Sequence, residues 1–167
     1  MNMKGAVTVA CEPPHRQDVR DLLRRSDAHM ATLYPAESIH TLDIGELMQP
    51  LVRFLVARLG ERAVGCGALV LGDNRSAELK RMYVEEAARG QGVGSAILSA
   101  LQDMARQENV TLIRLETGVR QPEAIRLYRR FGFKELRAFG AYRDDPLSVF
   151  MEKHLAPGAP APPGARR

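Results

Sequence analysis

The feature that most constrains this chain is a glycine-rich segment near its middle, Arg89-Gly90-Gln91-Gly92-Val93-Gly94-Ser95. The residues before it alternate as in a strand, and those after it repeat apolar side chains at helical spacing. Alternating glycines let the backbone approach a ligand closely, and the first amides of the following helix lack partners and carry partial positive charge. The segment therefore predicts a binding loop for an anion.

Two well-known anion loops do not match this segment. A Walker A loop has a lysine before its serine or threonine, and Val93-Gly94-Ser95 lacks that lysine. A dinucleotide-binding fingerprint lies in the first βα unit of a domain, whereas this segment follows several predicted strands. A helix preceded by a flexible loop, with no ligand, remains the alternative interpretation.

The pattern along the chain predicts one α+β domain over residues 1–155. Alternating or β-branched segments predict strands, and apolar residues at helical spacing predict helices. We expect strands over 7–10, 51–58, 62–71, 77–84, 111–117, 133–136 and 147–153, and helices over 15–34, 44–48, 93–108 and 122–131. Their order predicts an antiparallel meander that becomes parallel where helices cross over.

Composition sets further limits. The 167 residues, 45% of them hydrophobic and 26% charged, suit one globular domain and exclude a wholly disordered chain. The net charge of +4 is scattered and only 5% of residues are aromatic, so we expect no nucleic acid partner. Cys11 and Cys66 lack metal-site spacing, and we expect no metal. The longest apolar run, 63–71, is too short to cross a bilayer, so we expect no membrane partner.

Both chain ends carry their own signals. Residues 7–10 are followed closely by Pro13-Pro14 and are interpreted as a first strand rather than as a secretory leader, so we expect a cytoplasmic protein. Residues 156–167 are rich in Pro, Ala and Gly and have no large apolar side chain. They predict a disordered tail.

Three segments resemble the GCN5-related N-acetyltransferase (GNAT) family, in that family's order and spacing. They are the strand 78–84, Arg89-x-x-Gly92-x-Gly94, and Ala124-x-x-Leu127-Tyr128-x-x-Phe131-Gly132-Phe133. Segments 35–40, 116–118 and 145–151 are also similar to a small bacterial subgroup of acetyltransferases, a likeness that names no substrate. The resemblance implies a mixed, mostly antiparallel central sheet flanked by helices, in which a splayed strand pair forms the acyl-CoA slot.

The resemblance implies acetyl-CoA as cosubstrate. In the family, the loop amides hold the pyrophosphate, and the backbone here at Met82 and Val84 would pair with the pantetheine arm. The Met82 amide would also polarise the thioester carbonyl. Gln121 stands where the family often has asparagine, so a longer amide would contact pantetheine. The implied cofactor-binding residues are Met82, Tyr83, Val84, Arg89, Gly90, Gln91, Gly92, Val93, Gly94, Ser95, Gln121 and Tyr128.

Tyr128 and Glu78 are the implied catalytic residues. Tyr128 matches the tyrosine that protonates the departing thiolate, a role that suits a phenol with a pKa near ~10. Core packing is the alternative for this side chain. Glu78 is the candidate base, and strand alternation predicts that it shares a face with Met82. A solvated glutamate near Lys80 is the alternative, and Glu116 is the second candidate base.

The acceptor pocket in GNAT proteins lies under a connector, here residues 34–50, and opposite the loop before the last strand. Arg143 offers a bidentate partner for a carboxylate, while His40 or Ser38 orients the rest of a ligand. We therefore expect a small, carboxylate-bearing amine rather than a polycation. The candidate acceptor-binding residues are Tyr34, Ser38, His40, Glu116, Tyr142 and Arg143.

The sequence thus predicts an N-acetyltransferase that transfers acetyl directly from acetyl-CoA to the primary amine of a small molecule. This reaction needs no covalent nucleophile. Two alternatives stay open, a non-catalytic acyl-CoA-binding module and an acetyltransferase of protein amino groups. The resemblance also allows a homodimer, an assembly common in the family.

Overall fold

The central sheet has seven strands in the order β1-β2-β3-β4-β5-β7-β6. The computed structural model describes residues 5–156, so the predicted tail from residue 157 onward lies outside the described residues. Strands β4 and β5 are parallel, and the other neighbouring pairs are antiparallel, which confirms the predicted fold class. The strands are β1 (Val7–Cys11), β2 (Val52–Leu59), β3 (Arg62–Leu71), β4 (Ser76–Val84), β5 (Leu112–Gly118), β6 (Lys134–Leu136) and β7 (Ser148–His154).

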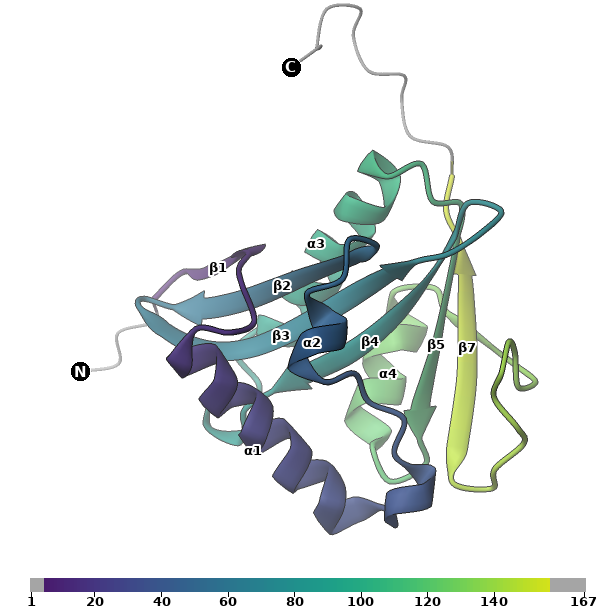
Figure 1. The fold of residues 1–167 in the computed structure, drawn as a ribbon, viewed down its shortest axis with the longest axis horizontal. Helices are drawn as coiled ribbons and strands as arrows, with labels where there is room; N and C mark the ends of the chain where they lie inside the picture. The colour runs from purple at the N-terminus through teal and green to yellow at the C-terminus, as the bar shows by residue number, and fades with distance from the viewer. Residues whose placement is uncertain (1–4, 157–167) are drawn as a thin grey trace, which may run out of the picture.

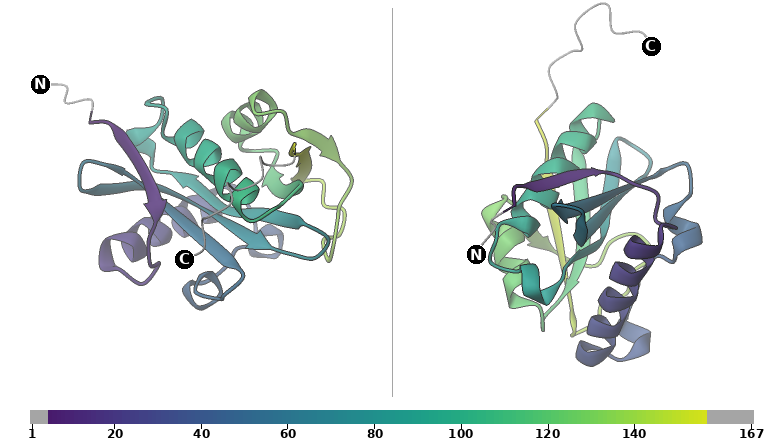
Figure 2. Two further views of the ribbon diagram at one scale, coloured as in Figure 1. Left: turned by 90° about the horizontal axis from the view of Figure 1, so that it is seen from above. Right: turned by 90° about the vertical axis from the view of Figure 1, so that its left-hand side faces the viewer.

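Helices cover both faces of this sheet. Figure 1 shows α1 and α2 in front of the strands and α3 and α4 behind them, and Figure 2 shows the two layers from other sides. One apolar core, with Ile97 and Leu101, lies on the α3 face, and a second, with Leu22, lies on the α1 face. The helices are α1 (Gln17–Leu33), α2 (Ile44–Leu47), α3 (Val93–Gln107) and α4 (Pro122–Arg130), with short 3-10 turns η1 (Ala36–Ser38) and η2 (Glu86–Ala88).

Strands β4 and β5 separate partway along their length. Their parallel pairing runs from Ser76 opposite Leu112 to Leu79 opposite Leu115. Strand β4 continues to Val84 and β5 to Gly118, beyond the last paired residues. The structure therefore confirms the predicted splayed strand pair.

A β-bulge interrupts β4 at the point of separation. Arg81 has a φ of +57°, and the register against β3 shifts between Ala68, which faces Lys80, and Cys66, which faces Tyr83. One extra residue on β4 reverses the alternation of side chains beyond it. The prediction that Glu78 and Met82 share a face is therefore wrong, because it assumed an unbroken strand.

The placement of Met82 agrees with this reversal. Its side chain packs on the α3 face of the sheet together with Val84 and with Leu79, which precedes the bulge. Arg81 instead donates hydrogen bonds to Asp27 of α1 and to Thr41 of the connector. Glu78 is the neighbour of Leu79 and lies on the α1 face.

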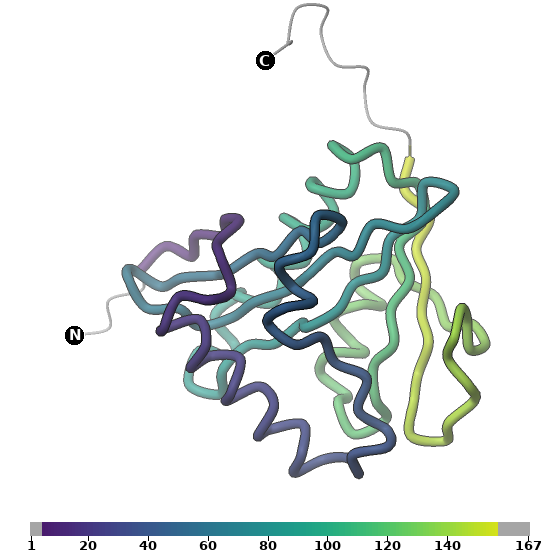
Figure 3. Tube along the Cα trace, in the orientation of Figure 1, coloured from purple at the N-terminus to yellow at the C-terminus, as the bar shows by residue number. Residues whose placement is uncertain are grey.

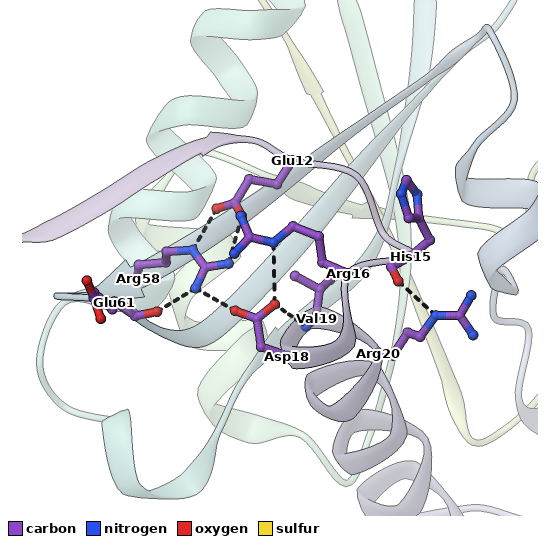
Figure 4. Close-up of polar contacts among 8 residues, drawn as sticks. All are labelled: Glu12, His15, Arg16, Asp18, Val19, Arg20, Arg58 and Glu61. Carbon is purple, nitrogen blue, oxygen red and sulfur yellow. Dashed lines mark hydrogen bonds and ion pairs between the residues drawn. The ribbon is translucent and has the colours of Figure 1, made fainter.

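A mostly buried arginine ties the start of α1 to the sheet (Figure 4). Arg58 of β2 donates hydrogen bonds to both carboxylate oxygens of Glu12, at 2.7 and 2.8 Å, and to Asp18 at 2.7 Å. The side chains of Arg58 and Glu12 are 13% and 14% exposed, so solvent screens this pair little. The hydrogen bond from Arg58 also holds the pKa of Asp18 below its ordinary value. The network fixes the direction in which α1 leaves β1.

Arg58→Met should lower the free energy of unfolding at neutral pH by about 2 kcal/mol, because it removes the mostly buried partner of two carboxylates and leaves them only the exposed Arg16. A carboxylate whose folded-state pKa is lowered stabilises the fold above its unfolded-state pKa, and this contribution is lost as the pH falls through the folded-state pKa. The difference from wild type should therefore narrow below about pH 4. Urea unfolding from neutral to acidic pH measures it. An equal loss in Arg24→Met, a control whose side chain is 70% exposed, would contradict the assignment.

Candidate active site

A cleft of about 550 Å³ opens where β4 and β5 separate. The glycine-rich loop and the start of α3 line one part of it, and the connector lines another. Figure 3 shows the connector passing in front of the diverging ends of the two strands. The cleft thus brings the predicted cofactor residues and most of the predicted acceptor residues into one space.

The glycine-rich loop adopts backbone conformations that favour glycine. Gly90 and Gly92 have φ values of +75° and +80°, and Gly92 is the N-cap of α3. No heavy atom outside the neighbouring residues lies within 4 Å of a Cβ built on either glycine, so the space beside the loop is open. The first amides of α3, beginning at Val93, have no acceptor within the helix. This is the geometry of an anion-binding helix terminus.

The other predicted cofactor residues surround this loop. Met82, Tyr83, Val84 and Gln121 all line the cleft, and Arg89 donates a 3.1 Å hydrogen bond to the Val84 carbonyl oxygen. Gln91 lies outside the cleft lining, and its side chain donates to the Ala87 carbonyl oxygen.

Tyr34 holds the end of α1 against the end of β5. Its hydroxyl accepts a 3.0 Å hydrogen bond from the Arg120 amide and donates to the Gln121 side-chain oxygen at 3.3 Å. A Cβ on Gly118 would lie 2.0 Å from this hydroxyl, so the contact requires glycine there. Tyr34 is buried and lines the cleft beside Gln121, near the predicted pantetheine contact as well as the acceptor pocket.

Tyr128 of α4 is both a core residue and a residue of the cleft lining. The side chain is 3% exposed, and its ring packs edge-on against Phe133 at 5.8 Å between centroids. Burial raises the pKa of the phenol well above its ordinary value. The hydroxyl therefore keeps its proton at neutral pH, as a hydrogen-bond and proton donor must. The two interpretations of the sequence, core packing and proton donation, are compatible.

Glu78 lies at the acceptor side of the cleft and is engaged by two neighbours. Its Oε1 accepts a short hydrogen bond from the Tyr142 hydroxyl and lies 3.6 Å from the Lys80 ammonium. Lys80 in turn donates to the Tyr142 hydroxyl at 2.7 Å. Burial is the main cause that raises the pKa of Tyr142, and the hydrogen bond to Glu78 adds to it.

Glu116 of β5 forms a second polar cluster with the connector. Its carboxylate lies 3.0 Å from Nδ1 of His40 and accepts a 3.2 Å hydrogen bond from Ser148. Burial raises the pKa of Glu116, and the charge of His40 and the hydrogen bonds oppose this effect. Nearby, Ser38 donates to Asp145 at 2.7 Å. These contacts fasten the connector to β5 and to the loop before β7.

Arg143 does not take the place that the sequence predicted for it. It is exposed and lies outside the cleft lining, whereas the neighbouring Tyr142 packs inward against Phe139 and Phe150. Lys80 and Arg81 of β4, which were not predicted as acceptor residues, are among the cations that do line the cleft. The alternation Glu78, Lys80 was visible in the sequence, but the bulge that turns Arg81 toward the connector was not.

Residues 5–156 present neither a set of metal-ligating side chains nor a candidate membrane span. No three His, Cys, Asp or Glu side chains gather there in a way that suits a metal ion. No helix in that range is both long and apolar enough to cross a membrane.

Comparison with known proteins agrees with the fold and the cleft. The model of the acetyltransferase (GNAT) family matches residues 16–133. A relative from Azospirillum brasilense, named IAA acetyltransferase, is 45% identical over 150 residues, which cover 89% of this chain and 98% of that protein. The uncharacterized N-acetyltransferase YsnE of Bacillus subtilis is 36% identical over 128 residues, 75% of this chain and 85% of that protein.

A solved structure from Klebsiella pneumoniae, described as a candidate acyl-CoA N-acyltransferase, superposes with a TM-score of 0.76 at 38% identity. The match covers 90% of this chain and 98% of that one. The family match spans most of the described residues and includes the glycine-rich loop and Tyr128. The chain therefore belongs to the GNAT family of acetyltransferases, which use acetyl-CoA.

Proposed function

We propose that this acetyltransferase transfers the acetyl group directly from acetyl-CoA to the primary amine of a small molecule. The observation that carries the proposal is the connector fastened over the acceptor side of the cleft. Through His40 and Ser38 it is joined to Glu116 and Asp145, and both connector side chains line the cleft of about 550 Å³. A concave pocket of this size suits a small acceptor better than a protein chain. The name of the Azospirillum brasilense relative supports a small-molecule acceptor.

Acetyl-CoA is proposed to lie along the open edge of β4. The amides from Gly92 to Ser95 bind the pyrophosphate, and the backbone of Met82 and Val84, beyond the last residue paired with β5, binds the pantetheine arm. The Met82 amide then polarises the thioester carbonyl. Gln121 lines the same cleft, where its side chain also accepts from Tyr34.

In the proposed reaction, a neutral amine attacks the thioester carbon and forms the N–C bond. The carbonyl π electrons move to oxygen and return as the C–S bond breaks. Tyr128 protonates the departing thiolate, and the new amide loses its extra proton, which restores the tyrosine through solvent. The acceptor is limited to a small amine in this proposal, because the exposed Arg143 gives no support for a bound carboxylate.

Release of the CoA thiol in the presence of single amines tests the function. The panel contains tyramine, phenylalanine, spermidine and a short peptide with a free amino terminus. Turnover with a small amine, with the acetylated product identified by mass, would support the proposal. Turnover with the peptide alone would favour protein amino groups as acceptors. CoA binding without turnover on any amine would favour the non-catalytic module.

Gly92→Val should abolish CoA binding, because its side chain strains the loop and occupies the space beside the amides. In the wild type, CoA at a hundredfold its Kd should raise the free energy of unfolding by about 2.7 kcal/mol. Thermal unfolding with and without CoA measures this difference. The matched control is Gly60→Val, at a hairpin glycine with a φ of +60° and open space around it. If CoA stabilises Gly92→Val as much as the wild type, the loop is not part of the CoA-binding site.

Tyr128→Phe should lower kcat by roughly 10²-fold while CoA binding persists, because it keeps the ring and deletes the proton donor. Steady-state kinetics and CoA titration of the same preparation separate the two effects. A pre-steady-state burst experiment shows whether the chemical step limits the rate. If the chemical step limits the rate and kcat is still unchanged in Tyr128→Phe, Tyr128 has a role in core packing alone.

A further inference from the structure

His40 and Glu116 form a pair whose geometry goes beyond fastening the connector. The imidazole Nδ1 lies 3.0 Å from Oε2 and 3.3 Å from Oε1 of the carboxylate, and the Ser148 hydroxyl donates to Oε1 at 3.2 Å. The His40 ring also meets the Tyr142 ring edge-on at 5.5 Å between centroids. Three elements, β5, β7 and the loop before β7, therefore hold this imidazole in one orientation.

The carboxylate determines which nitrogen of a neutral His40 carries the proton. The Glu116 side chain is only 12% exposed, so its ionised form needs hydrogen-bond donors. Nδ1–H of His40 is such a donor, and it leaves the lone pair of the ring on Nε2. A histidine oriented by a carboxylate through Nδ1 accepts protons at Nε2 in many enzymes.

Glu78, the base predicted from the sequence, is less free to accept a proton. Its Oε1 already accepts the hydrogen bond from Tyr142 and lies near the Lys80 ammonium. Both contacts engage this oxygen, so it is less available to an acceptor amine. The structure gives Glu78 a role in holding Tyr142 and Lys80 at the edge of the acceptor pocket.

We propose that His40 is the general base for the acceptor amine and that Glu116 is its positioning residue, an inference that rests on the proposed acetyl transfer. The acceptor enters as an ammonium, and Nε2 of His40 takes one of its protons. The neutral amine then attacks the thioester carbon, and the C–S bond breaks as described above. His40 passes its proton to water, since its side chain is 41% exposed.

Several charged groups around the pocket affect the titration of this pair. Glu116 contacts the imidazole directly. The charge of His40 contributes to lowering the pKa of Asp145, and the charge of Lys80 in β4 works to lower the pKa of Glu116. Tyr142 packs on the ring and connects it to Glu78. A pH profile must therefore be compared between variants rather than assigned from one enzyme.

His40→Asn tests the base, because the asparagine side-chain NH₂ can replace the Nδ1–H donor to Glu116 but cannot accept the proton. With the best amine of the panel, wild-type kcat/KM should rise between about pH 5 and 8, where imidazoles titrate. In His40→Asn this rise should be lost and kcat/KM at neutral pH should fall by roughly 10²-fold. CoA-dependent stabilisation should persist. His15→Asn, at an exposed histidine outside the cleft lining, is the matched control.

Glu78→Gln separates the two candidate bases, because glutamine keeps an acceptor oxygen for Tyr142. Its profile should retain the rise, whatever happens to the maximal rate. Loss of the rise in Glu78→Gln together with its retention in His40→Asn would overturn the inference and return the base to Glu78.

The tautomer of His40 gives a second readout that needs no acceptor. Long-range ¹H–¹⁵N NMR spectra of the wild type above the titration range should show the proton on Nδ1. A proton on Nε2 would overturn the inference even with an active enzyme. If the wild type acetylates no amine of the panel, the proposed function is overturned, and the base with it. If the enzyme is active but His40→Asn has the same pH profile as the wild type, the base alone is overturned.

Discussion

The separation of β4 from β5 is the constraint on which the site depends. Two parallel strands that stayed paired to their ends would leave no space between them, and the cleft would be filled by main-chain hydrogen bonds. Here the pairing stops at Leu79 and Leu115, and the bulge at Arg81 turns the rest of β4 while keeping it on β3. The same few residues thus open an edge for a strand-like ligand and direct Arg81 toward the connector.

The connector supplies what the sheet lacks, a cover for the open end. It has little regular secondary structure, and polar contacts fix it at several points along its length. Tyr34 meets the end of β5, Ser38 meets Asp145, His40 meets Glu116, and Thr41 meets Arg81. Each contact joins residues far apart in the sequence. Because the covering segment is held by side chains that also line the pocket, substitutions in that lining should alter both the shape of the pocket and the position of its cover.

Most of the fold was predictable because its signals are local. Strands, helices and the glycine-rich loop follow from alternation, helical spacing and backbone freedom, and the structure has them at nearly the expected bounds. The errors came from non-local features. The bulge at Arg81 left no mark in the local pattern, so strand alternation wrongly put Met82 on the same face as Glu78. The charge of Arg143 predicted a place in the pocket for this residue. In the structure its neighbour Tyr142 points inward instead, because the tyrosine ring packs on Phe139 and Phe150. The pairing of His40 with Glu116 joins segments that no single-sequence pattern connects.

The charges of the acceptor pocket explain why two glutamates can share it. Each would be costly alone in a half-buried space, and each has its own partners, Lys80 and Tyr142 for Glu78, His40 and Ser148 for Glu116. The two sets differ in one respect. Lysine and tyrosine hold their protons at neutral pH, whereas an imidazole exchanges its proton there. Glu116 therefore has as its partner the side-chain type that can accept a proton from an ammonium, whereas the partners of Glu78 are side-chain types that cannot.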